Sequence, residues 1–241
     1  MIYRHIWTIH LTIILSVIYS AVHLPIAYCI AFVVVGIPMG CIIGNVGLHR
    51  YFTHRSFRCN TWTHWILLIL CTFSAQGPVS LWVASHKSHH KFSDTERDQH
   101  SPRIHGFWPA FFAHWGWIGQ LTYTMEFPSG WKGLMYKTSR FVQYTTDYYV
   151  PVTLGFMLCV YAISPVLYFA YAWLVVIMLI GEGITNSVGH ISGTSIDHQR
   201  LNWCLWWTET PYHHYHHVRP YAHRMTEFDP AGWFIERIRT P

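Results

Sequence analysis

Four long apolar stretches restrict what this chain can fold into. About 20 helical residues cover a hydrocarbon core of roughly 30 Å, and in lipid such segments must be helices to satisfy their own backbone hydrogen bonds. The stretches lie at residues 6–24, 26–46, 149–165 and 166–185. Charged residues make up only 11% of the chain, too few for an ordinary soluble surface. We therefore predict an all-α integral membrane protein with one domain, residues 1–241.

The positive charges predict which side of the membrane each part faces. The turns near Pro25 and Pro165 are short, so the four spans should form two helical hairpins, and neither turn carries a Lys or Arg. Ten such residues lie between His49 and Asp147, and five follow His190. The positive-inside rule then places both termini in the cytoplasm, with a helical cap formed by residues 47–148 and 186–241.

Two further apolar segments lie within the predicted cap. Residues 62–75 offer about 14 apolar positions, which is short for a span. A crossing there would also put the histidines on its two sides on opposite faces of the membrane. Residues 106–121 are rich in aromatic side chains. We expect both segments to lie at the cytoplasmic interface.

Nine histidines fall into four short clusters that predict a metal site. In the spacing H-x-x-H-H the first, fourth and fifth positions lie within about 100° of one another on a helix, so each of two such motifs should aim three imidazoles at a common region. His49 and His54 lie about 140° apart on a regular helix, so the second must follow a helix end or a distortion. The nine candidates are His49, His54, His86, His89, His90, His190, His213, His216 and His217. Isolated histidines, such as His10, are interpreted as interfacial surface residues.

The fourth span brings a polar side chain to the same region. Glu182, Asn186 and His190 follow one another at intervals of four residues and therefore share one helix face. We expect Asn186 and His190 to project from the cytoplasmic end of this span toward the clusters. An acid in a membrane helix is costly and often functional, so Glu182 is expected to orient a ligand imidazole, to carry protons to reduced oxygen, or to snorkel to the interface.

The ligand types narrow the chemistry. Nine neutral imidazoles suit two metal ions better than one. The six cysteines are scattered, with no C-x-x-C pair, which argues against iron–sulfur clusters and structural zinc. Nearly neutral ligands leave the metals electrophilic and able to bind and reduce O2, for which iron is the natural choice. The sequence therefore predicts two iron ions (Fe2+/Fe3+), with O2 as co-substrate and a lipid-like substrate.

Other side chains are candidates for supporting this site. Acidic residues and one histidine close to the clusters are expected to orient the ligand imidazoles. These candidates are Glu182, Asp94, Asp98, His100 and Glu209.

The second span carries a glycine at every fourth position. Gly36, Gly40 and Gly44 favour either close helix packing or room for an acyl chain next to His49. With Trp82, these glycines are the candidates for lining a substrate tunnel.

With these residues identified, the sequence resembles the integral-membrane fatty acid desaturases of the stearoyl-CoA desaturase-like family. The segments GLHRYFTHRSF, SHKSHHKFSDTERDQHSP and PYHHYHHVRP are similar to the three histidine boxes of that family, and NSVGH is similar to its Asn/His motif. The similarity runs from about Gly44 to the end of the chain. It departs from the family pattern at residues 208–211, where Gly-Glu-Gly is usual, and at Ser85.

The resemblance implies a diiron enzyme that introduces a double bond into an acyl chain. The nine histidines would be metal ligands, and Asn186 would contact one iron through water. The iron ions would perform the oxidation with O2 and two electrons, while the protein positions the chain in a narrow, dry tunnel. The acyl carrier stays open between coenzyme A, acyl carrier protein and an acyl lipid.

No flavin or nicotinamide fingerprint is present, so the electrons are expected from an external ferredoxin or cytochrome b5 type carrier. Four cations near the second box favour an acidic donor or anionic membrane lipids; they are Lys87, Lys91, Arg97 and Arg103. No nucleic acid partner is predicted. The shortness of the chain favours a bacterial inner membrane over the endoplasmic reticulum.

Several other functions compete with this one. An acetylenase, a desaturase that forms a terminal alkene, and a diiron alkane or acyl hydroxylase share the abstraction of hydrogen from an acyl or alkyl chain. A metal transporter or sensor is a more remote alternative, because transporters place their ligands near mid-bilayer, whereas these clusters are expected at one surface.

Overall fold

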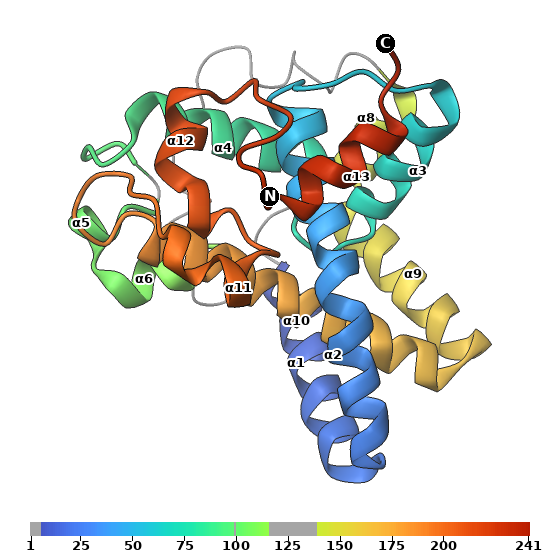
Figure 1. Ribbon diagram of the computed structural model, residues 1–241. Helices are drawn as coiled ribbons and strands as arrows, with labels where there is room; N and C mark the ends of the chain where they lie inside the picture. The colour runs from blue at the N-terminus through green and yellow to red at the C-terminus, as the bar shows by residue number, and fades with distance from the viewer. Residues whose placement is uncertain (1–5, 99, 116–138) are drawn as a thin grey trace.

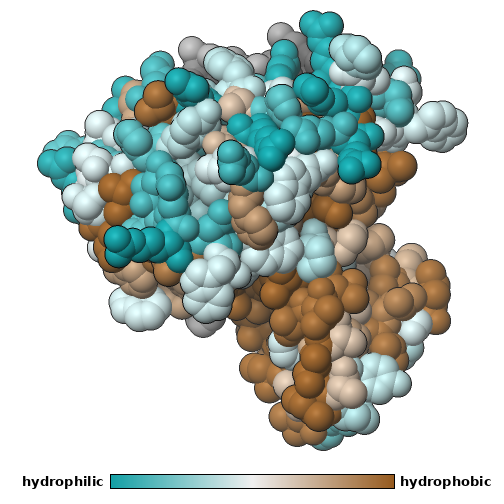
Figure 2. All heavy atoms as spheres, in the orientation of Figure 1, coloured by the Kyte–Doolittle hydropathy of each residue, from teal (hydrophilic) through white to brown (hydrophobic). Residues whose placement is uncertain are grey.

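The computed structural model describes residues 6–98, 100–115 and 139–241, and the regular structure in these ranges is helical. Figure 1 shows a stem of long helices below a broader cap of short ones. Figure 2 shows that the exposed surface of the stem is mostly apolar, while that of the cap is mostly polar. Among the described residues, β-type pairing is limited to an isolated bridge between Cys59 and Arg239. The predicted all-α fold is confirmed.

The stem consists of helices α1 (Ile6–His23), α2 (Ile26–Cys41), α9 (Tyr149–Ile163) and α10 (Pro165–Val188). Helix α2 continues directly into a π-helix, η2 (Ile42–Thr53). In the described part of the chain, α1, the α2–η2 unit and α10 are long and apolar enough to cross a membrane. Helix α9 reaches that length only together with α8 (Arg140–Asp147), from which it bends by 91°. The described residues therefore offer three or four spans.

The observed helices run further into the cap than the apolar pattern predicts. The second predicted span ends at residue 46, whereas η2 ends at Thr53, and the fourth ends at residue 185, whereas α10 ends at Val188. The difference has a physical reason, because the added turns carry His49, Asn186 and other polar residues that face the interior of the cap. Hydropathy locates the lipid boundary rather than the helix end.

Helix α10 packs closely on α2 at the glycines of the second span. A Cβ atom added to Gly36 would lie 2.7 Å from Ile177 Cδ1, and one added to Gly40 would lie 3.2 Å from Met178 Cγ. Small residues let membrane helices approach in this way. At Gly36 the two helices are in direct contact, so any cavity between α2 and α10 must lie above this residue, toward the cap.

The cap is built from short helices around the upper ends of α2–η2 and α10. They are α3 (Thr61–Thr72), α4 (Val79–Phe92), α5 (Pro102–His105), α6 (Phe107–Phe111), α8, η4 (Gln199–Leu201), α11 (Asn202–Leu205), η5 (Thr210–Tyr212), α12 (His213–Val218) and α13 (Pro230–Ile238). Helix α3 has 12 residues, too few to cross, and it exposes Trp62 while burying Leu67 and Leu68. Of the aromatic segment 106–121, residues 116–121 lie outside the described part of the chain.

His10 differs from the expectation of a surface histidine. It lies on α1, its side chain is buried, and its Nε2 is 2.8 Å from the carbonyl oxygen of Ala75. Ala75 follows the end of α3, where carbonyl groups lack helical donors. The imidazole therefore supplies a hydrogen-bond donor that α1 brings beneath the cap.

Candidate metal centre

The nine clustered histidines meet inside the cap, although they come from four separate parts of the chain. Their ring nitrogens form two sets whose members all lie within 4.8 Å of one another. The first histidine group consists of His49, His54, His86, His90 and His216. The second histidine group consists of His89, His190, His213 and His217. The fold thus gathers residues as far apart as 167 positions, as in the pair His49 and His216.

The ring nitrogens in each group are as close as ligands of one ion. In the first group, His216 Nε2 lies 3.0 Å from His49 Nε2 and 2.7 Å from His90 Nε2. In the second group, His190 Nε2 lies 3.1 Å from His89 Nε2 and 2.7 Å from His213 Nε2. Nitrogens about 2.1 Å from a central ion are about 3 Å apart when adjacent around it. Both groups match that spacing.

Each H-x-x-H-H motif divides its imidazoles between the two groups, which differs from the single region that the spacing predicts. Helix α4 gives His86 and His90 to the first group and His89 to the second. Helix α12 gives His213 and His217 to the second group and His216 to the first. The physical reason is that residues four apart differ by only about 40° around a helix, whereas the remaining histidine points about 60° away from the first of them and about 100° away from the second.

The π-helix η2 explains how His49 and His54 reach the same group. The amide of His54 donates to the carbonyl of His49 at 3.0 Å, a bond between residues five apart. Such bonds define π-helical turns, which are wider than α-helical ones. The widening brings the two imidazoles to one side, with ring centroids 4.9 Å apart. The predicted distortion is therefore the π-helix itself, with His54 just beyond its last residue.

Two aspartates hold ligands of the second group. His89 Nδ1 lies 3.0 Å from Asp98 Oδ1, and His190 Nδ1 lies 2.7 Å from Asp94 Oδ2. Burial raises the pKa of Asp94, but hydrogen bonds from His190 and Ser101 outweigh it, so the pKa lies below its ordinary value. An ionised carboxylate accepts a proton-bearing Nδ1–H, which leaves each Nε2 with a free lone pair.

That arrangement fits a bound cation. The Nε2 atoms of His89 and His190 face each other at 3.1 Å, and both Nδ1 atoms already donate to carboxylates. Two lone pairs at this separation repel unless a positive ion lies between them. Histidine ligands of metals commonly donate their second nitrogen to a carboxylate in this way. The donor set therefore fits metal binding.

A buried network of charged side chains lies next to His49 of the first histidine group. Glu209 Oε1 lies 3.3 Å from His49 Nδ1 and 3.1 Å from Arg50 Nη2. Arg50, which is 1% exposed, also donates to Asp229 Oδ2 at 2.7 Å. Burial raises the pKa of Glu209, but Arg50 and His49 outweigh it and hold the pKa well below its ordinary value. Asp229 also accepts from the Gly232 amide and so ties α13 to this network.

Burial keeps most of the nine imidazoles neutral. It lowers the pKa of His90 to about 3 and that of His217 to about 2, and neighbouring histidines act in the same direction. For the same reasons, four other members have a pKa well below the ordinary value: His86, His89, His213 and His216. Neutral imidazole is the form that coordinates metals, so these side chains are ready to bind without losing a proton.

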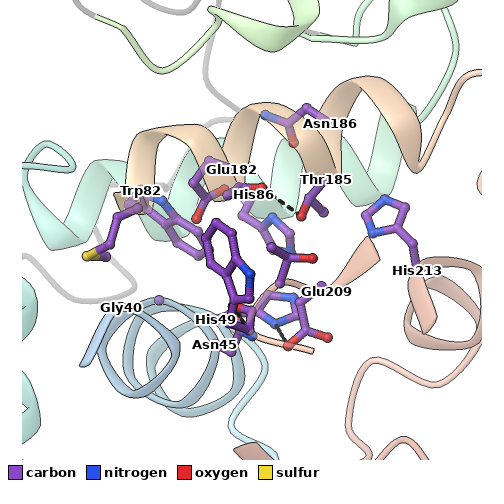
Figure 3. Close-up of a pocket in the computed structure, with 15 residues that line it drawn as sticks. Gly40, Asn45, His49, Trp82, His86, Glu182, Thr185, Asn186, Glu209 and His213 are labelled. Carbon is purple, nitrogen blue, oxygen red and sulfur yellow. Dashed lines mark hydrogen bonds and ion pairs between the residues drawn. The ribbon is translucent and has the colours of Figure 1, made fainter. Parts of the chain in front are cut away.

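A cavity of about 40 Å³ lies beside the first group, between α2–η2 and α10. Figure 3 shows His49, His86 and Glu182 turned toward it. Gly40, Gly44 and Met178 line one end, and Asn186, Thr208 and Glu209 line the other. A space of this size holds about three water molecules. It is the place where a substrate can approach the imidazoles.

The structure places the remaining candidates as follows. Trp82, Gly40 and Gly44 line the cavity, whereas Gly36 contacts Ile177 below it. His100 lies beside His89, with ring centroids 4.4 Å apart, and joins His89 and Asp98 in a third set of possible ligands. Asn186 is buried, and its Nδ2 has no hydrogen-bond partner among the described residues. Glu182 makes no described contact with a ligand imidazole.

Arg50 and Asp229 are functional candidates that sequence reasoning missed. Arg50 lies between two ligand candidates in the first box, but the sequence does not distinguish it from the exposed Arg55. Asp229 carries a local signal, since an acid before a proline and an apolar run is typical of a helix start. That signal predicts the cap of α13 and gives no indication of the ion pair with Arg50.

The comparison with known proteins agrees with this geometry. A family model of fatty acid desaturases matches residues 23–225. The chain belongs to the fatty acid desaturase family. The match includes all nine histidines, so the two histidine groups of this chain lie within the shared part of the family.

Individual relatives match different parts of this chain. It is 28% identical over 197 residues to the sn-1 stearoyl-lipid 9-desaturase of Synechocystis sp., covering 74% of this chain and 57% of the relative. It is 29% identical over 204 residues to acyl-CoA desaturase 3 of Mus musculus, covering 76% and 55%. A shorter match of 85 residues, 44% identical, joins it to the hex-5-enoyl-[acyl-carrier protein] acetylenase of Moorena producens, covering 31% and 26%. The chain thus spans little more than half the length of the first of these relatives.

Proposed function

We propose that this desaturase-family chain is an O2-dependent diiron fatty acyl desaturase that introduces a double bond into an acyl chain with two electrons from an external carrier. The observation that carries the proposal is the convergence of nine imidazoles into two adjoining groups beside a cavity that reaches into the apolar stem. Family membership supplies the reaction class. The geometry supplies two sets of neutral nitrogen donors.

In this proposal each histidine group holds one iron ion, and Asn186 contacts one of them through water. When bound, the two iron ions supply the oxidation of an unactivated methylene with O2, which no side-chain acid or base achieves. Asp98 and Asp94 accept the Nδ1 protons of His89 and His190 and so fix their rings, and the Glu209 carboxylate lies 3.3 Å from Nδ1 of His49. Gly40, Gly44 and Trp82 shape the wall along which the acyl chain lies, and an acyl chain that fills the cavity would keep water from the imidazoles.

The membrane arrangement belongs to the same proposal. Four spans in two hairpins, with α8–α9 counted as the third, would place the cap and both termini in the cytoplasm. The distribution of Lys and Arg supports this orientation. A bacterial inner membrane is the proposed location.

The electron donor is proposed to be a ferredoxin or cytochrome b5 type protein. Lys91, Arg97 and Arg103 are exposed on the cap near the second box. Arg97 and Lys91 both lie over the ring of Phe92, at 3.8 and 5.2 Å from its centroid. This exposed positive surface suits an acidic donor and also suits anionic headgroups.

The test is the lipid profile of a host that lacks the activity, measured by mass spectrometry with and without expression of the chain. The neighbouring variants His213→Ala and His214→Ala form a matched pair, because His213 belongs to the second group whereas His214 is exposed. We expect unsaturated products from the wild type and from His214→Ala, and none from His213→Ala at equal protein levels. Products from His213→Ala, or none from the wild type supplied with a donor, would contradict the proposal.

An acetylenase is the second candidate. The observation that favours it is the 44% identity over 85 residues to a relative whose name describes the oxidation of a hexenoyl chain on acyl carrier protein. The same lipid profile distinguishes the two functions when the host is also given an alkenoyl substrate. An alkyne product identifies the acetylenase.

A further inference from the structure

The cavity beside the first histidine group has an apolar end that is short. Gly40, Gly44 and Met178 line this end. Directly below it, α2 and α10 are in contact, because a Cβ on Gly36 would lie 2.7 Å from Ile177 Cδ1. The two helices therefore close the space within one turn of Gly40.

Glu182 marks where the apolar end stops. Its carboxyl group lines the cavity one helical turn above Met178, and Figure 3 shows it beside Trp82 and His86. One such turn of four residues rises about 6 Å, a length that about five carbons of an extended alkyl chain cover. At the level of Glu182 the cavity lining also includes Thr185 and Thr208, so an occupant meets polar groups there beside the rings of Trp82 and Trp207.

The polar groups on this wall have unused hydrogen-bonding capacity. No hydrogen bond or ion pair joins Glu182 to another described residue. The Trp82 side chain is 5% exposed, and its indole N–H has no partner among the described residues. The same is true of Asn186 Nδ2. Buried polar groups without partners are rare and costly, so these two buried donors, together with the partly exposed carboxyl group of Glu182 in the same cavity lining, point to a ligand that supplies the missing partners.

A long saturated alkyl chain is a poor match for this wall. Its methylene groups would cover a carboxyl group and two N–H donors without offering any hydrogen bond, at a cost of about 1–3 kcal/mol for each buried group. A hydroxyl or an amide offers both a donor and an acceptor. Either group would satisfy Glu182 and one of the N–H donors together.

We propose that the cavity is specific for an acyl substrate with a short apolar end followed by a hydrogen-bonding group that Glu182 and Trp82 recognise. The inference rests on the proposed function in taking an acyl chain as the occupant. Two sources have this chemistry: a short acyl group on an amide-bearing pantetheine arm, and a longer chain with a hydroxyl about five or six carbons from its methyl end. In both, Glu182 is a specificity residue rather than a metal ligand.

The test measures binding to the purified full chain in lipid nanodiscs. The probes are hexanoyl-pantetheine, an octadecanoyl ester hydroxylated about six carbons from its methyl end, and the same ester without the hydroxyl. We expect at least one polar probe to bind about ten-fold more tightly than the plain ester, as one or two satisfied hydrogen bonds allow. Whichever polar probe binds identifies the source.

Variants at Glu182 show whether this side chain sets the preference. Glu182→Leu is expected to abolish the ten-fold preference, while Glu182→Gln, which keeps a carbonyl acceptor, retains most of it. Glu227→Leu removes an exposed acid from the cap and serves as the matched control. An unchanged melting transition shows that each variant is folded. Equal binding of all three probes, or a preference that survives Glu182→Leu, overturns the inference.

The outcome separates this inference from the proposed function. If the host profile shows desaturated long chains and the plain ester binds as well as the others, the proposed function stands and the specificity is wrong. If the polar probes bind preferentially but no acyl product forms with any donor, the specificity stands and the proposed desaturation is wrong.

Discussion

Replacing Arg50 is the sharpest test of how the cap is held together. Arg50 is the cation between two buried carboxylates: its Nη2 is 3.1 Å from Glu209 and its Nη1 is 2.7 Å from Asp229. In Arg50→Met both acids lose their counter-ion while their side chains stay buried. Breaking a buried pair by removing one partner costs about 3–5 kcal/mol. For a chain of this length, each kcal/mol lowers the melting temperature by about 2–4 °C, so we expect a fall of about 6–20 °C.

The measurement is the unfolding temperature of purified protein in detergent, followed by tryptophan fluorescence. The triple variant Arg50→Met/Glu209→Gln/Asp229→Asn leaves no unpaired charge, so it should recover part of the loss. An Arg50→Met protein that melts within 2 °C of the wild type (an order-of-magnitude threshold, about 1 kcal/mol) would refute the reasoning. A triple variant less stable than Arg50→Met would also refute it.

Metal content separates the two carboxylates. Glu209 contacts His49 as well as Arg50, whereas Asp229 contacts no ligand candidate. Glu209→Gln should weaken metal affinity by about 10–100-fold, the usual effect of losing a group that orients a ligand. Asp229→Asn should lower the melting temperature and leave the metal bound per folded chain unchanged.

Three further predictions concern the metal centre and the stem. His89→Ala should lower iron, measured by elemental analysis, from two ions per chain toward one, and a full complement would count against a ligand role for His89. Gly183→Ala should destabilise the packing of α10 on α6 by about 1–3 kcal/mol, because an added Cβ would lie 2.5 Å from the backbone oxygen of Phe111. Gly155→Ala, where an added Cβ meets nothing within 4 Å, should be neutral or stabilising, and equal unfolding temperatures of the two variants would disprove the close contact. Burial lowers the pKa of His90 to about 3 and that of His217 to about 2, so both imidazoles are already unprotonated at pH 7. Calorimetry of metal binding in buffers of different ionisation heat should therefore show that less than about one proton is released per ion bound. A larger release would show that these imidazoles are protonated before metal binds.

The sequence predicts the stem and the meeting of the histidines because both depend on local chemistry. Apolar length locates α1 and α10 to within a few residues, since lipid permits only helix there. The spacing of His49 and His54 requires a distortion, and η2 provides one. Spacing also places three imidazoles on one turn of α4 and of α12.

The division into two groups could not be read from spacing alone. Whether His89 joins His86 or His190 depends on where α10 and α12 end relative to α4, which is a property of tertiary packing. The partners of Arg50 are equally non-local, because Glu209 and Asp229 lie 159 and 179 residues further along the chain. The apolar end of the cavity is short because α10 contacts α2 at Gly36 through Ile177. The repeated glycines of the second span do not by themselves predict which of them makes this contact.

Helices α4 and α12 each contribute to both histidine groups, so neither helix can rotate to suit one ion without disturbing the seat of the other. Binding of the first ion would therefore immobilise α4 and α12, the two helices that also form the binding site of the second ion. Metal binding should consequently be cooperative, so that protein molecules with no ion or with two ions outnumber those with one ion during reconstitution.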